Sequence, residues 1–183
     1  MNTHTPYRIA ARKLLLTYND TTMPLQHVWD HLFPILQKTK QNGAEKYLLV
    51  KERRESGKID LHVFIKLNYK LDTRNRKFFD IEYNDSIYNG EYQPCTSEKR
   101  TIQSLLEKSN QEDRLTNLWL DSNDQILSLD EYCLELVRTE GIPSARDFYL
   151  EYATWEEIEE NFNKNLEAWT NYAEALSKDK EKE

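Results

Sequence analysis

The stretch KYLLVKERRESGKIDLHVFIKL (46–67) constrains the fold more than any other part of the sequence, because it is typical of a β-hairpin. Residues 46–53 are rich in apolar side chains, and residues 59–67 alternate between apolar and polar ones. Between them, Ser56–Lys58 contains a glycine and is typical of a turn. The segment therefore predicts two antiparallel strands, each with side chains alternating between the two faces of a sheet.

Other segments add strands and helices around this hairpin. Strands are expected at 10–18, 79–83 and 86–95, and helices at 23–40 and 96–109, where the second helix begins after a Thr96 or Ser97 cap. Pro34 is expected to kink or split the first helix. This order predicts an α+β domain with a mainly antiparallel sheet.

A polar stretch without a regular pattern, NQEDRLTN (110–117), follows, and the rest of the chain is expected to be helical. One helix begins after a Ser128 cap and ends near Gly141, and a later one begins with a Thr154–Glu157 capping box. Aromatic residues recur at helical spacing along the last helix, which leaves two roles open for them, a core or a partner surface. We therefore expect two domains, 1–115 and 116–183, the second an acidic helical segment for oligomerisation or partner binding.

Charge is distributed unevenly between these parts. Residues 1–115 carry 19 Lys and Arg against 15 Asp and Glu, a net charge of +4, whereas residues 116–183 carry 6 against 17, a net charge of −11. Together they give the −7 of the whole chain. Because attraction to phosphate drives nucleic-acid affinity, only the first part is a candidate for binding DNA or RNA. The acidic helices are expected to face solvent or to meet a basic partner protein.

Several classes of protein are not indicated. No apolar run approaches the roughly 20 residues of a membrane-spanning helix, and the N-terminal MNTHTPYRIAARK lacks the apolar core of a secretory signal. Cys95 and Cys133 fit no metal-binding or redox spacing and are expected to be reduced thiols. We therefore expect an intracellular protein, nuclear or cytoplasmic, with no membrane partner.

The hairpin carries a candidate metal site made of Glu52, Asp60 and His62. Asp60 and His62 share one face of their strand, and residues across a hairpin lie about 5 Å apart directly or about 7–8 Å apart diagonally. Carboxylates favour Mg²⁺ or Mn²⁺ and imidazole favours later transition metals, so the mixed set suits Mn²⁺ best. The residues alone leave three interpretations open: a metal site, the remnant of one, or an ordinary strand.

Four segments in sequence order resemble the HUH endonuclease domain of the replication initiator (Rep) proteins of circular single-stranded DNA viruses and plasmids. LLLTYND (14–20) resembles the first motif, GKIDLHVFIKL (57–67) the metal-binding strand, RNRKFFDI (74–81) the basic segment that follows, and YQPCTSEKRTIQSLLEK (92–108) the run into the third motif. The resemblance covers about residues 8–110. It implies an antiparallel sheet flanked by helices, a ferredoxin-like palm, with a C-terminal helical appendage.

The resemblance also implies a reaction, in which a tyrosine attacks a DNA phosphate that a divalent ion polarises. Two histidines and an upstream acid hold that ion. Here Glu52 matches the acid and His62 the second histidine, but Asp60 stands in place of the first. Leu105 stands at the position of the tyrosine and Lys108 at that of a supporting lysine. Because leucine has no nucleophilic atom, we expect a catalytically inactive domain that binds Mn²⁺ or Mg²⁺ weakly or not at all.

Two further features bear on activity. In a register shifted by one residue, Ser104 stands at the tyrosine position and offers a substitute hydroxyl. The four glycines form no G-x-x-x-x-G-K-[ST] loop, so the helicase that usually follows such a domain is not indicated.

Three functions therefore remain open. The first is an inactive Rep-like domain that binds single-stranded or origin-like DNA within a larger complex. The second is a protein-interaction or scaffold subunit that docks, or forms a homo-oligomer, through its C-terminal helices. The third is a metal-dependent, site-specific nickase with a non-standard active site. For the first, we expect DNA contacts from Lys13, Thr17, Lys66, Lys70, Arg74, Arg76 and Lys77.

Overall fold

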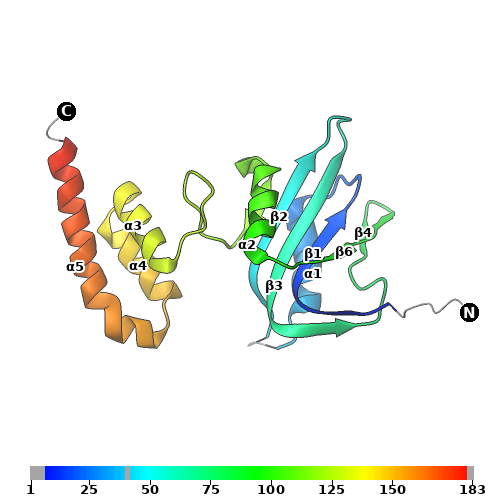
Figure 1. Cartoon of the computed structure of the whole chain (residues 1–183), viewed down its shortest axis with the longest axis horizontal. Helices are drawn as coiled ribbons and strands as arrows, with labels where there is room; N and C mark the ends of the chain where they lie inside the picture. The colour runs from blue at the N-terminus through cyan, green and yellow to red at the C-terminus, as the bar shows by residue number, and fades with distance from the viewer. Residues whose placement is uncertain (1–6, 40–41, 181–183) are drawn as a thin grey trace, which may run out of the picture. The chain divides into compact units, whose positions relative to one another are not determined.

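The computed structural model describes residues 7–39 and 42–180 (Figure 1). Packing of the Cα atoms divides the chain into two compact units between Asn117 and Leu118. The first unit contains a five-stranded sheet with helices, and the second contains the helices α3, α4 and α5. This confirms the α+β fold with a C-terminal helical region that the sequence predicts.

The sheet of the first unit is antiparallel at every pairing, in the strand order β6-β1-β3-β2-β7. Its strands are β1 (Ile9–Tyr18), β2 (Ala44–Arg53), β3 (Ile59–Thr73), β6 (Glu91–Pro94) and β7 (Arg114–Thr116). The predicted hairpin forms β2 and β3, and β3 continues beyond the predicted end to pair with the start of β1. The short edge strand β7 lies in a stretch for which the sequence predicts no regular structure.

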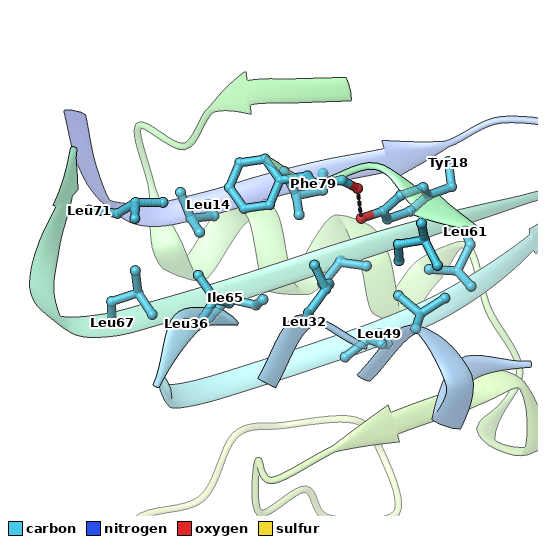
Figure 2. Close-up of a cluster of buried hydrophobic side chains, with 14 of the residues drawn as sticks. Leu14, Tyr18, Leu32, Leu36, Leu49, Leu61, Ile65, Leu67, Leu71 and Phe79 are labelled. Atoms are coloured by element: carbon cyan, nitrogen blue, oxygen red, sulfur yellow. Dashed lines mark hydrogen bonds between the residues drawn. The ribbon is translucent and has the colours of Figure 1, made fainter. Parts of the chain in front are cut away.

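One face of this sheet packs against α1 (Leu25–Leu36) to form the core (Figure 2). The helix buries Val28, Leu32 and Leu36 at helical spacing, and the strands contribute alternate apolar residues such as Leu61 and Ile65. Burial of each such side chain stabilises the fold by about 1.5–3 kcal/mol. This apolar face fixes the register, because a slip by one residue would move every side chain to the other face.

Of the two outcomes expected for Pro34, a kink or a split, the split does not occur. Pro34 lies inside α1, and the helix continues to Leu36 before Gln37 caps it. Since Pro34 lies in the last turn, the N–H that it lacks removes only the one hydrogen bond to the carbonyl four residues earlier. The apolar contacts of Leu32 and Leu36 with the sheet compensate for that loss.

The region expected as one strand at 86–95 is divided, which corrects the prediction. Residues Ile81–Tyr83 (β4) and Ser86–Tyr88 (β5) form a small hairpin, and β6 begins after Gly90. A Cβ at Gly90 would lie 2.6 Å from the Cβ of Phe79 and 2.9 Å from the hydroxyl of Tyr18. The backbone therefore passes too close to the core for any other residue, and this approach separates β5 from β6.

The second sheet face is covered by α2 (Glu98–Glu107). Ser97 is its N-cap and accepts a hydrogen bond from the backbone N–H of Arg100, which settles the choice between Thr96 and Ser97. The helix buries Ile102, Leu105 and Leu106. After a 3₁₀ turn at Gln111–Asp113 the chain enters β7.

The second unit packs α3 (Leu129–Thr139), α4 (Ile142–Tyr152) and α5 (Trp155–Lys180) around Cys133, Tyr149 and Trp169. The Ser128 and Thr154 capping boxes are both formed, and Gly141 has φ +97° after the end of α3. Trp169 is therefore a core residue, whereas Trp155 is 74% exposed. Among the described residues, no helix is long and apolar enough to cross a membrane.

Candidate functional site

The polar residues of the candidate site lie on the sheet face that α2 covers. Leu61 and Val63 of β3 point into the core under α1, so Asp60 before them and His62 between them point the other way. Thr17 of β1 is the direct neighbour of His62 across the sheet. Glu52 of β2 faces Asp60 in the same manner. The hairpin register therefore assembles these side chains as the sequence predicts.

Glu52 is the centre of a hydrogen-bonded chain. Its Oε2 atom lies 2.7 Å from Nε2 of His62 and 3.2 Å from Nζ of Lys108 at the end of α2. The Nδ1 atom of His62 lies 3.1 Å from Oγ1 of Thr17. Because an ionised carboxylate only accepts, Nε2 of His62 is the donor, and in a neutral imidazole Nδ1 then accepts from the threonine hydroxyl. Both ring nitrogens of His62 are therefore occupied.

The pKa of Glu52 follows from this environment. Partial burial alone would raise it, but the hydrogen bonds and charges of His62 and Lys108 outweigh burial, so the pKa lies below its ordinary value. Glu52 is therefore ionised at neutral pH. Its carboxylate links the sheet to α2 through Lys108.

Asp60 takes a different set of partners. It is 5% exposed, its Oδ2 accepts a hydrogen bond of 2.5 Å from Nε of Arg54, and Nη2 of the same guanidinium forms an ion pair with that oxygen. Its Oδ1 accepts a 3.0 Å hydrogen bond from the backbone N–H of Asp20, a residue with φ +50°. Arg54 also donates to the side chain of Asn19. Asp60 thus joins the hairpin to the end of β1.

A cleft of about 490 Å³ opens between the sheet face and α2. Two basic side chains, Arg100 and Lys108, line it together with the hydroxyls of Thr101 and Ser104. Leu105 forms part of its wall, 4% exposed, and contributes only carbon atoms. The other lining residues come from the sheet strands and the end of β1, and they are Leu15, Thr17, Asn19, Asp60, His62, Glu91 and Gln93.

The residues expected to contact DNA fall into two groups. Thr17 lines the cleft, and Lys13 and Lys66 are paired across β1 and β3 on the same sheet face. Lys66 donates a 2.7 Å hydrogen bond to Glu45 and lies 4.0 Å from Glu98, and these carboxylates raise its pKa even though burial opposes the shift. Much of its charge is therefore neutralised within the protein.

The second group lies away from the cleft. Lys70 is near the C-terminal end of β3, and Arg74, Arg76 and Lys77 follow in the exposed loop beyond it. None of the four lines the cleft. The guanidinium of Arg76 lies over the ring of Tyr7, 5.8 Å from its centroid. Of the seven residues expected to contact DNA, only Thr17 lines the cleft, and the role of each residue stays a prediction.

Two basic residues of the site were not predicted from the sequence, Arg54 and Arg100. Arg54 directly follows β2, two positions beyond Glu52, so the period of two, extended one residue past the strand, could have placed it beside Asp60. Arg100 lies on α2, and its position over the cleft depends on how that helix packs on the sheet. No local pattern in the sequence signals that packing.

The divalent ion that the resemblance implies can be tested against these donors. Glu52 and His62 meet, but Asp60 is bound to Arg54 and to a backbone N–H, and Lys108 already contacts the same Glu52 oxygen as His62. Within 7–39 and 42–180, no group of three His, Cys, Asp or Glu side chains could hold a metal ion. The residues as arranged therefore do not fit a three-ligand divalent metal site.

Comparison with known proteins gives one match. A family model described as the geminivirus Rep catalytic domain matches residues 7–112, which is more than half of the chain. No curated protein matches the chain. The matched range ends just after α2, so it contains the hairpin, the cleft and both basic residues that line it. Because this match covers more than half of the chain, the chain belongs to the family of geminivirus Rep catalytic domains.

Proposed function

We propose that this chain is a Rep-family domain that binds DNA in the cleft between its sheet and α2 and does not nick it. Membership of the family implies origin DNA binding and nicking in general. The observation that carries the finer proposal is Leu105. In the register that the resemblance implies, Leu105 stands at the position of the family's tyrosine, and it lies in the wall of the cleft that Lys108 also lines.

Leucine cannot replace the tyrosine chemically. Covalent catalysis needs an atom with a lone pair that can attack the phosphorus, and the Leu105 side chain offers only methyl and methine groups. Leu105 is 4% exposed and packs on the same buried helix face as Ile102 and Leu106. Leu105 therefore contributes to packing, and the polar groups of the cleft come from other residues.

The same groups can hold a DNA strand. Arg100 and Lys108 supply positive charge in the cleft, and Thr101 and Ser104 supply hydroxyl groups. Basic side chains provide most of the affinity for phosphates, and hydroxyl groups position the backbone. The first unit carries a net charge of +4, which is consistent with modest and salt-sensitive binding.

Fluorescence anisotropy of labelled single-stranded oligonucleotides tests this proposal. Binding should weaken as salt increases, and Arg100→Ala should reduce the slope of log K against log salt by about 0.7, the value for one phosphate contact on a single strand. Lys99→Ala is the matched control, because Lys99 is an exposed neighbour on α2 that does not line the cleft. If the protein shows no salt-dependent binding at low ionic strength, or if both variants behave alike, the cleft is not the DNA site.

One observation favours the alternative of an active nickase. The hydroxyls of Ser104 and Thr101 line the same cleft as His62. An activated serine needs a base within hydrogen-bond reach, but the two ring nitrogens of His62 are occupied by Glu52 and Thr17. Ser104→Ala separates the two proposals, because it should abolish cleavage by such an enzyme, whereas a domain that only binds DNA should show no cleavage with or without the substitution.

A second candidate function rests on the second unit. Residues 118–183 carry 6 Lys and Arg against 17 Asp and Glu, a net charge of −11, and expose Leu150, Tyr152 and Trp155 beside this acidic surface. This combination favours a basic protein partner over a second copy, since two copies with a net charge of −11 each repel one another. Sedimentation equilibrium of the full chain tests the choice, and a concentration-dependent dimer that Trp155→Ala abolishes would favour the homo-oligomer.

A further inference from the structure

Asp60 occupies the position where the family resemblance places the first metal-binding histidine, but both of its carboxylate oxygens already have protein partners. Nε of Arg54 donates a hydrogen bond to Oδ2, Nη2 of Arg54 forms an ion pair with the same oxygen, and the backbone N–H of Asp20 donates to Oδ1. The side chain of Asp60 is 7% exposed, whereas that of Arg54 is 44% exposed. To bind a metal, Asp60 would have to give up the guanidinium or share its buried oxygens with a second cation.

The charges of the site are balanced without a metal. Glu52 and Asp60 contribute two negative charges, and Lys108 and Arg54 contribute two positive charges within hydrogen-bond distance of them. These four side chains sum to zero. A divalent ion placed among them would therefore gain little attraction and would be repelled by two cations that are charged at neutral pH.

We propose that Arg54 has taken over the charge-neutralising role of the divalent ion, so that the cleft binds a single-stranded DNA phosphodiester without any metal. The inference rests on the proposed function for its ligand. Arginine suits this role because its guanidinium keeps its charge at all physiological pH values and can grip a carboxylate with two parallel N–H donors. The consequence is a DNA-binding site whose affinity is insensitive to chelators.

Two measurements on the full chain test the inference. The first follows Mn²⁺ by its electron paramagnetic resonance signal, which falls when the ion leaves bulk water for a protein site. The unsubstituted protein should leave the signal unchanged at millimolar Mn²⁺. The variant R54M/D60H removes the guanidinium and rebuilds an H-x-H pair, so it should reduce the signal with saturation at one ion per chain. Saturable Mn²⁺ binding by the unsubstituted protein, lost in His62→Ala, would overturn the inference.

The second measurement compares oligonucleotide affinity in EDTA with affinity in MnCl₂ at matched ionic strength. The affinity of the unsubstituted protein should differ by less than about twofold, since only screening acts on the complex. A gain of about tenfold or more in MnCl₂ that His62→Ala removes, equivalent to about 1.4 kcal/mol, would contradict the inference.

The two measurements also separate this inference from the proposed function. If no oligonucleotide binds under any condition, DNA binding fails as the function, and the Mn²⁺ titration still decides whether Arg54 has replaced the metal. If oligonucleotides bind only with Mn²⁺, DNA binding stands and the replacement is wrong. Circular dichroism of R54M/D60H shows whether the variant is folded. If it is not folded, the Mn²⁺ titration of the unsubstituted protein alone decides.

Discussion

Removal of the guanidinium from Arg54 should destabilise the first unit, and the size of the effect follows from its contacts. Arg54→Met keeps most of the length of the side chain but leaves the Asp60 carboxylate with only the Asp20 N–H. Hydrogen bonds to charged groups contribute about 1.5–3 kcal/mol, whereas exposed ion pairs contribute about 0–1 kcal/mol. Because one partner is buried and the other half exposed, we expect a loss of about 2 kcal/mol.

A double-mutant cycle isolates the pair. Asp60→Asn keeps an acceptor for the Asp20 N–H and removes the charge, so R54M/D60N should be less destabilised than the sum of the single variants by about 1.5 kcal/mol. The control is Arg8→Met, because Arg8 pairs with Asp72 through side chains that are 51% and 47% exposed. That variant should change the stability much less than Arg54→Met does, because solvent screens an exposed ion pair.

The assay is urea unfolding followed by NMR signals of backbone amides in β1 and β3, which report on the first unit alone. At an m value of about 2 kcal/mol per molar, Arg54→Met should lower the urea midpoint by about 1 M. An Arg54→Met shift no larger than that of Arg8→Met, or a coupling energy near zero, would show that Asp60 is not held by Arg54. In that case Arg54 would not have replaced the metal at Asp60.

Three further predictions follow from the same structure. Leu105→Tyr alone should give no covalent protein–DNA adduct in Mn²⁺, whereas Leu105→Tyr combined with R54M/D60H should give an adduct that is visible on a denaturing gel. Equal amounts of adduct from both variants would mean that the Arg54–Asp60 ion pair does not block the metal. Gly90→Ala should cost about 1–3 kcal/mol of unfolding free energy by overpacking, measured by urea unfolding, and an unchanged midpoint would contradict the close backbone approach. Burial raises the pKa of the Cys133 thiol to about 11, so in the native protein Cys133 should resist alkylation at pH 8 while the other cysteine reacts. The stability of the second unit should fall as pH rises above about 9, because the thiol of the unfolded chain ionises there and the native thiol does not. Rapid alkylation of Cys133, or a stability that is flat between pH 8 and 11, would refute this.

Much of the fold is encoded in local patterns that can be recognised in the sequence. The turn and the alternating strand at 59–67 fix the register that places Glu52 opposite Asp60. Helix starts at Ser97, Ser128 and Thr154 depend on side chains next to the backbone groups that they cap, so they were predictable as well. Such features do not depend on distant parts of the chain.

The features that escaped prediction depend on contacts between distant segments. The three-residue strand β7 has no periodicity of its own and forms only because β2 offers a free edge. The division between β5 and β6 depends on Gly90 meeting Phe79. Likewise, the sequence shows that Asp60 and His62 share a strand face. Only the packed structure shows that Asp60 is hydrogen-bonded to Arg54 and His62 to Glu52.

The most direct test of the central claim is a search for cleavage across many DNA sequences at once, so that the DNA site need not be specified. The protein is incubated with a library of single-stranded stem-loop oligonucleotides with randomised loops, in Mn²⁺ or Mg²⁺, and both covalent adducts and new DNA ends are recovered under denaturing conditions and sequenced. We predict that the unsubstituted protein enriches neither above a control without protein, while it retains oligonucleotides under native conditions. Reproducible cleavage at one sequence that His62→Ala or Ser104→Ala abolishes would show that the domain is an active nickase and contradict the account.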